Sequence, residues 1–410
     1  MKNSSPIVIV GASIAGVSAA EVLCAECDEP ILLIDADSHE PYDRTALSKG
    51  MLKIVDASPD IQIRTRQALE AQGITLRLGA IATGLDIAAK EVVLANGERI
   101  AFSRLLIATG ASPVVPFPVT KGARVHVLRS FDDASDLRAS MAPGRHIAVI
   151  GAGLIGCEIA STARDCGLEV TVITGERGPF AQALGMDAAR FVEALQQRAG
   201  VRTIVDAQVK GVRLDEAAHI VQLANGTEIQ ADLVVAGTGV IPSTAWLENS
   251  PVSVDRGVLC DNYFRTSVPS IYAAGDVARW PGGLDGALAR VEHWTSAAEQ
   301  GAAAARALLE PERPPSAMPL PYFMTELHGH RMQVVGYTAV ADENRLFVAS
   351  EGDDRPLILY RKGGRVIGCL AVGRPKAAAN FNAMIGSGGT WDDALLLAQR
   401  LVSTVAVPTR

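Results

Sequence analysis

Two glycine-rich segments that recur 140 positions apart constrain the fold of this chain more than any other feature of its sequence. The first, Gly11 to Gly16, directly follows the β-branched run Ile7 to Val10, and the second, Gly151 to Gly156, directly follows Ile147 to Ile150. A short apolar run that ends at a glycine turn is typical of a strand buried in a parallel sheet. The chain therefore contains the start of one strand–turn–helix unit twice.

Each glycine segment leads into a helical stretch and then a second strand, as a βαβ unit requires. We expect helices to about Cys24 and through Arg164, followed by strands at Ile31 to Ile34 and Val170 to Ile173. Glycines at such turns let the backbone approach a pyrophosphate, and the next helix directs free N–H groups at that anion. Asp35 stands where an acidic side chain accepts from a ribose hydroxyl. Two dinucleotide sites are predicted, most simply for FAD and NAD(P).

Three more features fit this interpretation. Apolar runs at 104–111 and 233–239, each preceded by an Asn-Gly hairpin turn, are expected to be strands that end in a small-residue turn and close the two nucleotide-binding domains. The segment from Thr266 to Asp276 is expected to be a strand that ends in Gly275-Asp276, where a carboxylate accepts from the ribityl hydroxyls of FAD. Ser13 replaces the second glycine of the first unit, and we interpret it as a variant whose hydroxyl adds a phosphate contact.

Composition excludes several classes of protein. The 410 residues predict two or three domains, and a net charge of −7 with 48% hydrophobic residues is ordinary for a globular chain. Neither disorder nor nucleic-acid binding is expected. No apolar run approaches the roughly 18 residues of a membrane helix, and the amino terminus leads straight into a strand-like run, so we expect a cytoplasmic protein without a membrane partner. The six scattered cysteines are interpreted as reduced thiols.

The residues resemble the FAD-dependent pyridine-nucleotide oxidoreductases, and among them the ferredoxin reductases of Rieske aromatic-ring dioxygenases (toluene and biphenyl type) and of bacterial haem monooxygenases. The most specific segment is PYDRTALSK at 41–49, although Thr45 and Ala46 replace the two prolines usual there. Met324 stands where many relatives have tryptophan. The other matching segments are LRSFDDASDLR around Arg129, GAGLIGCE ending at Glu158, RVEHWTSAAEQG from Arg290 and PYFMTELHGHRMQVVGY from Pro321.

The resemblance implies a set of residues that bind the two cofactors, and no metal ligands. The expected cofactor-binding residues are Gly11, Ser13, Ala15, Gly16, Asp35, Asp37, Arg44, Lys49, Ala82, Ala108, Thr109, Gly110, Arg129, Gly151, Gly153, Leu154, Ile155, Gly156, Glu158, Thr174, Glu176, Arg177, Gly237, Gly239, Gly275, Asp276, Glu292, His293 and Trp294.

The repeat and the resemblance together predict an α/β fold with two Rossmann-like dinucleotide-binding domains, one inserted in the other, and a smaller carboxy-terminal α+β domain. The FAD domain is expected at 1–113 and 243–318, the NAD(P) domain at 114–242 and the last domain at 319–410. The proline-rich stretch from Pro311 to Pro321 is interpreted as a linker. In the last domain, strands are expected at 332–337, 345–349, 357–361 and 366–372.

Hydride transfer from nicotinamide to flavin needs no protein acid, base or nucleophile, because the cofactors carry the chemistry. The resemblance places Lys49 near the N5 edge of the flavin, paired with Glu158, and we assign these two residues the catalytic role. A positive charge there favours electron density entering the flavin.

Cysteine and histidine side chains are not expected to take part in electron transfer or to bind a metal. No cysteine lies in 41–49, where disulfide reductases carry a redox pair. Cys24 and Cys27 fall at the far end of a helix, whose negative dipole end raises a thiol pKa. His328 and His330 are expected to project from one side of a strand without completing a metal site.

With no second redox centre, the reduced FAD must pass electrons on, so we predict an NAD(P)H:ferredoxin oxidoreductase. Its partner would be a small iron-sulfur ferredoxin, two-iron two-sulfur of Rieske or plant/adrenodoxin type, that feeds an oxygenase. Basic residues could steer this acidic partner: Arg290, Arg361, Lys362, Arg374 and Lys376. The alternatives are an NADH oxidase or another acceptor-reducing flavoprotein, and a redox-sensing interaction flavoprotein.

The preference between NADH and NADPH depends on residues 174–177. Relatives selective for NADH commonly end this strand in an acidic residue, and Thr174 occupies that place. Glu176 could accept from the 2′-hydroxyl and repel a 2′-phosphate, whereas Arg177 could pair with that phosphate. We expect NADH, with NADPH possible.

Overall fold

The computed structural model describes residues 5–53, 61–312, 318–350 and 352–403. The chain divides into two compact units, each assembled from three chain segments. Unit 1 comprises Met1–Ala46, Pro59–Ser112 and Val240–Pro319, and unit 2 comprises Leu47–Ser58, Pro113–Gly239 and Leu320–Arg410. The boundaries of the three domains expected from the sequence stay a prediction. Residues 313–317 of the expected linker lie outside the described residues.

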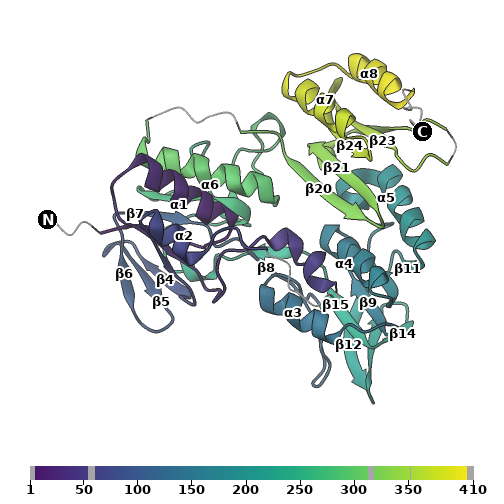
Figure 1. Ribbon diagram of the computed structural model, residues 1–410, viewed down its shortest axis with the longest axis horizontal. Helices are drawn as coiled ribbons and strands as arrows, with labels where there is room; N and C mark the ends of the chain where they lie inside the picture. The colour runs from purple at the N-terminus through teal and green to yellow at the C-terminus, as the bar shows by residue number, and fades with distance from the viewer. Residues whose placement is uncertain (1–4, 54–60, 313–317, 351, 404–410) are drawn as a thin grey trace. The chain divides into compact units, whose positions relative to one another are not determined.

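Unit 1 is built on a parallel sheet with the strand order β18-β7-β1-β2-β3. The four residues of β1 are at most 4% exposed and pair in parallel with β2 and β7. Helices α1 and α6 lie side by side against this sheet (Figure 1). The elements are β1 (Ile7–Val10), α1 (Ile14–Glu26), β2 (Ile31–Ile34), α2 (Arg66–Ala71), β3 (Ile74–Arg77), β7 (Arg104–Ile107), β18 (Ile271–Ala273) and α6 (Trp294–Leu309).

Smaller strands and 3₁₀ turns complete unit 1. Strands β4, β5 and β6 form an antiparallel sheet of their own, with the predicted hairpin turn at Asn96-Gly97. These smaller elements are η1 (Arg44–Ala46), β4 (Ala82–Asp86), β5 (Glu91–Leu94), β6 (Arg99–Ala101), η3 (Ala245–Leu247), β17 (Val258–Leu259), η4 (Gly275–Val277), β19 (Ala278–Arg279) and η5 (Leu284–Gly286). Two further strands, β8 (Ala111–Pro113) and β16 (Val240–Pro242), pair with each other.

Unit 2 repeats the plan with a parallel sheet in the order β11-β10-β9-β15. In both sheets the strand before the glycine turn lies between the next strand of its βαβ unit and the strand that closes its nucleotide-binding unit, β7 or β15, which is the Rossmann order. The elements are η2 (Gly50–Leu52), α3 (Phe131–Ser140), β9 (His146–Ile150), α4 (Leu154–Asp165), β10 (Glu169–Ile173), α5 (Ala181–Arg198), β11 (Val201–Ile204), β12 (Val209–Asp215), β13 (Ala218–Leu223), β14 (Glu228–Ala231) and β15 (Leu233–Ala236).

The carboxy-terminal part of unit 2 is an antiparallel sheet in the order β20-β21-β24-β23-β22. Helices α7 and α8 pack on it through buried side chains that include Phe381 and Trp391 (Figure 1). The elements are β20 (Tyr322–Leu327), β21 (His330–Gly336), η6 (Thr338–Val340), β22 (Glu343–Phe347), β23 (Leu357–Lys362), β24 (Arg365–Val372), α7 (Pro375–Gly386) and α8 (Trp391–Ser403). Within the part of the chain that the structure describes, no helix combines the length and apolarity needed to cross a membrane.

Candidate functional site

The first glycine turn packs so tightly that only glycine fits at two of its positions. A Cβ at Gly11 would lie 2.1 Å from the carbonyl oxygen of Ala108, at the end of β7, and one at Gly16 would lie 1.8 Å from the carbonyl oxygen of Gly11. Gly11 also has φ +115°, in the region that glycine favours. The turn is therefore held against the carboxyl end of the sheet, where Rossmann folds bind their ligands.

The amino-terminal end of α1 is available to an anion. Ser13 is the N-cap residue, but its side chain forms no capping hydrogen bond, and the first turn holds no acidic residue. The first N–H groups of a helix have no intrahelical partner, so this end favours a phosphate. Two glycines allow close packing around Ala15. Gly275 approaches the Cβ of Ala15, and Gly301 of α6 approaches the carbonyl oxygen of Ala15.

Asp35 and Asp37 are ordered by hydrogen bonds after β2. The Asp35 carboxylate accepts from the backbone N–H of Ala12 and, at 2.8 Å, from that of Asp37. The Asp37 carboxylate accepts from the Tyr42 hydroxyl at 2.7 Å, and the Arg44 guanidinium lies 5.8 Å from the centre of the Tyr42 ring. The predicted acidic residue is thus fixed next to the glycine turn.

The other predicted residues of unit 1 come from η4, the start of α6 and the ends of strands. Burial lowers the pKa of His293 to about 4, while the negative charge of Asp276 acts in the opposite direction. Glu292 forms an ion pair with Arg290 at 2.8 Å, and Trp294 is exposed at the start of α6. The predicted cofactor-binding residues that lie in unit 1 are Gly11, Ser13, Ala15, Gly16, Asp35, Asp37, Arg44, Ala82, Ala108, Thr109, Gly110, Gly275, Asp276, Glu292, His293 and Trp294.

The second glycine turn repeats the close packing. A Cβ at Gly151 would lie 2.2 Å from the carbonyl oxygen of Gly237, and one at Gly156 would lie 2.0 Å from that of Gly151. Gly153 differs, because a Cβ there would meet nothing within 4 Å. Gly153 is the N-cap residue of α4, whose first turn contains no acidic residue. The open space at this helix end fits the approach of a pyrophosphate.

Thr174 and Glu176 are ordered at the end of β10. The Thr174 hydroxyl accepts from the backbone N–H of Glu176 at 3.1 Å, and the Glu176 carboxylate accepts from the N–H of Gln182 at 2.9 Å. Arg177 is exposed beside them. The predicted cofactor-binding residues that lie in unit 2 are Lys49, Arg129, Gly151, Gly153, Leu154, Ile155, Gly156, Glu158, Thr174, Glu176, Arg177, Gly237 and Gly239.

Lys49 and Glu158 form the expected ion pair, with 2.7 Å between Nζ and Oε1. Glu158 is 3% exposed, whereas the Lys49 side chain remains 35% exposed. Two hydroxyls also donate to the carboxylate: Ser48 to Oε2, and Thr325 to Oε1 at 2.6 Å. Sequence reasoning missed both hydroxyl residues, although Ser48 is next to Lys49 and Thr325 lies in a segment that matched the family.

Comparison with known proteins agrees with this architecture. The model of the family described as pyridine nucleotide-disulphide oxidoreductase matches residues 5–301. The chain belongs to this family. It is 34% identical over 381 residues to the ferredoxin–NAD(+) reductase component of the p-cumate 2,3-dioxygenase system of Pseudomonas putida, covering 92% of each chain. The corresponding component of the biphenyl dioxygenase system of Paraburkholderia xenovorans (strain LB400) is 33% identical, with 87% of this chain and 86% of the relative covered.

A solved structure extends the match through the carboxy-terminal domain. The covalent putidaredoxin reductase–putidaredoxin complex aligns with a TM-score of 0.88 and 28% identity, over 97% of this chain and 100% of the other. The predicted fold class, two Rossmann-like domains and a smaller carboxy-terminal domain, is therefore confirmed. The family resemblance stated from the sequence is confirmed as well.

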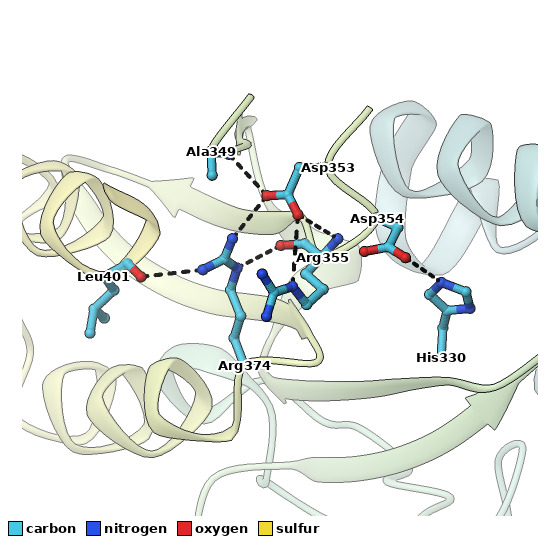
Figure 2. A network of polar contacts seen from close by, with 7 residues as sticks. All are labelled: His330, Ala349, Asp353, Asp354, Arg355, Arg374 and Leu401. Carbon is cyan, nitrogen blue, oxygen red and sulfur yellow. Dashed lines mark hydrogen bonds and ion pairs between the residues drawn. The ribbon is translucent and has the colours of Figure 1, made fainter. Parts of the chain in front are cut away.

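Two expectations about individual side chains were wrong. His328 does not lie on a strand: it has φ +49° and lies in the turn between β20 and β21, so it and His330 do not share a strand face. Arg374 is not available to steer a partner, because its side chain is only 9% exposed. Its guanidinium donates to the Asp353 carboxylate at 2.9 Å and to the carbonyl oxygens of Arg355 and Leu401 (Figure 2).

The cysteines have the properties of structural thiols. Within the described residues all six are free. Burial raises the pKa of Cys157 and Cys369, and raises that of Cys260 to about 12. Burial also raises the pKa of Cys27, at the carboxyl end of α1. These thiols are protonated at neutral pH, so they are poor nucleophiles. The described residues also contain no group of three or more histidine, cysteine or acidic side chains that could hold a metal.

Proposed function

We propose that this protein is an FAD-containing ferredoxin reductase, which takes electrons from NADH and passes them to a small iron-sulfur ferredoxin that feeds an oxygenase. The observation that carries the proposal is the pair of glycine turns, each at the end of a buried parallel strand and each opening a helix whose first turn lacks acidic residues. Two such anion sites in one chain match two dinucleotides.

The two units divide the cofactors between them. The first glycine turn, Asp35 and Asp276 would hold FAD, and the second glycine turn and Glu176 would hold NADH. FAD, when bound, supplies the redox chemistry, because it accepts two electrons with a hydride and releases them one at a time. The protein binds and orients both cofactors, and Lys49 supplies a positive charge that favours electron density in the flavin. Glu158 holds that lysine in place.

The partner is proposed to be a two-iron two-sulfur ferredoxin, of Rieske or plant/adrenodoxin type. Lys362 and Lys376 are exposed and remain candidates to steer an acidic protein. Arg290 and Arg361 are weaker candidates, because each forms an ion pair with a glutamate, Glu292 and Glu343. The free thiols fit a reducing compartment, so we place the protein in the cytoplasm.

Anaerobic turnover with NADH and a dioxygenase-type two-iron two-sulfur ferredoxin tests the proposal. We expect the ferredoxin to be reduced much faster than oxygen is consumed in a parallel aerobic assay without ferredoxin. Equal rates would instead support an NADH oxidase. Reduction of neither acceptor, together with a stable NADH-reduced flavin that changes the protein's assembly, would support the redox-sensing alternative.

A further inference from the structure

The Glu158 carboxylate accepts hydrogen bonds from side chains of two distant chain segments. Ser48 and Lys49 belong to the segment before η2, and Thr325 belongs to β20 of the carboxy-terminal sheet. Thr325 is 2% exposed and Glu158 is 3% exposed. A buried carboxylate that loses a donor is costly, so each of these contacts constrains the orientation of the carboxylate.

Side chains along helix α4 form hydrogen bonds with the segment that carries Lys49. Four residues after Glu158, the Thr162 hydroxyl donates to the carbonyl oxygen of Ser48 at 2.7 Å. Four residues further, the Cys166 thiol lies 3.7 Å from the carbonyl oxygen of Leu52. This spacing places Glu158 and Thr162 on one face of the helix, and Cys166 is its C-cap residue. The backbone next to Lys49 is therefore fixed by α4.

The same helix is attached to the β20–β21 hairpin. The backbone N–H of His328 donates to the Ser161 hydroxyl at 2.8 Å, one turn along α4 from the bond between Thr325 and Glu158. In β20 the buried residues alternate with exposed ones, which directs Thr325 and Leu327 away from the exposed Met324. The carboxy-terminal sheet thus contacts the carboxylate of the ion pair through the Thr325 hydroxyl.

We infer that Thr325 is a positioning residue for electron transfer: its hydroxyl fixes the Glu158 oxygen that holds the ammonium group of Lys49. The inference rests on the role of Lys49 in the proposed function. Oε1 of Glu158 contacts both Thr325 Oγ1 and Lys49 Nζ. Without this hydroxyl, Oε1 loses the donor that fixes it, while Ser48 still holds Oε2, so the position of the lysine charge is defined less closely. Valine keeps the shape of threonine and removes the donor, whereas serine keeps the donor.

The test measures anaerobic reduction of bound FAD by NADH in a stopped-flow instrument. Thr325→Val should lower the limiting rate of flavin reduction by about tenfold, the effect of losing one hydrogen bond to a charged group, with little change in the NADH concentration that gives half the limiting rate. Thr325→Ser is the matched control and should stay near the wild-type rate. In a Lys49→Met background, Thr325→Val should have no further effect.

Each result decides a different point. If Lys49→Met slows flavin reduction and Thr325→Val does not, the role of Thr325 is overturned and the proposed function stands. If the two substitutions multiply in the double variant, Thr325 acts independently of Lys49 and the inference also fails. If Lys49→Met leaves the rate unchanged with FAD retained, the role of Lys49 fails first and that of Thr325 with it. Should Thr325→Val not fold, Thr325→Ala makes the same comparison without a second β-branch methyl.

Discussion

Glu176 is the residue that should set the preference between NADH and NADPH. Its carboxylate is held by the N–H of Gln182, just inside α5, and its own N–H is bound by Thr174. A fixed negative charge at the end of the second strand of a Rossmann unit lies where the adenosine ribose binds, and it opposes a 2′-phosphate. We therefore expect the preference for NADH to depend on this side chain, because Thr174, the residue after β10, carries no charge.

Glu176→Ala should narrow the ratio of kcat/KM for NADH to that for NADPH by about tenfold, equivalent to roughly 1.4 kcal/mol of differential binding. Glu169→Ala removes the same charge from the other end of β10 and should leave the ratio unchanged. Steady-state assays with both nucleotides measure it. A wild type that favours NADPH would contradict the prediction and make Arg177 the determinant.

At the scale of residues, the sequence predicted charged partners better than hydroxyl partners. The pairing of Lys49 with Glu158 followed from the family resemblance, and the two side chains are in contact. Thr325 was missed because a hydroxyl residue on a strand has no distinguishing spacing, and its partner is 167 positions away in the chain. Arg374 was misassigned because arginines buried by carbonyl and carboxylate partners look the same in sequence as exposed ones.

Two glycines of the second glycine turn are expected to have different roles, Gly156 in packing and Gly153 in cofactor binding. Gly156 meets the backbone of Gly151, so Gly156→Ala should prevent the native turn and yield protein that melts at lower temperature. Gly153 faces open space. Gly153→Ala should therefore keep the wild-type melting temperature and raise the KM for NADH, because its methyl group occupies the space that the pyrophosphate needs. Thermal melting and NADH titration of both variants provide the check, and a normal KM in folded Gly153→Ala would contradict it.

The loop between β22 and β23 should make stability depend on pH. Although burial acts to raise the pKa of Asp353, the N–H groups of Ala349 and Arg355 and the Arg374 guanidinium hold it below its usual value (Figure 2). A carboxyl whose pKa is lower in the folded state stabilises the fold above its unfolded pKa of about 3.9. That contribution is lost as the pH falls through the lower, folded value.

Asp353→Asn should therefore lower Tm at pH 7 by about 3 °C, and the difference from wild type should shrink as the pH falls below 4. The control is Asp354→Asn, because Asp354 is exposed and lies 3.3 Å from His330 (Figure 2). It should change Tm little. Differential scanning calorimetry across this range measures both variants, and a pH-independent deficit in Asp353→Asn would count against the argument.

Most elements could be predicted from sequence because buried parallel strands are continuous β-branched runs. The strands at 7–10 and 31–34 agree residue for residue with β1 and β2. The strand expected from Thr266 is shorter, Ile271–Ala273, because the Thr266 hydroxyl bonds the N–H of Val268 in a local turn and Pro269 has no N–H to donate. Strand β20 was not predicted, since its mixed residues show no clear period.

At the scale of the whole molecule, the repeat in the sequence corresponds to two sheets of the same strand order in separate units. The FAD-binding residues are proposed to come from both ends of unit 1: the first turn lies near its start, and η4 and α6 lie more than 250 positions later. Gly301 and Gly275 bring these distant parts together at Ala15. A cofactor bound at this place would contact two segments of unit 1. Along the chain, these segments are connected only through residues of unit 2.

Removal of FAD should therefore loosen the contact between α1 and α6 more than any element of unit 2. A ligand that binds only the native state at 100 times its Kd stabilises that state by about 2.7 kcal/mol. We expect the FAD-free protein to melt at lower temperature, with added FAD restoring the value and added FMN, which lacks the adenosine monophosphate moiety, failing to do so. Hydrogen exchange resolved by peptide should show the lost protection in 11–26 and 294–309. Equal loss in β20 to β24, or a colourless protein unaffected by FAD, would exclude this assignment, because the glycine turn before α1 and the residues His293 and Trp294 at the start of α6 are both predicted to contact the cofactor.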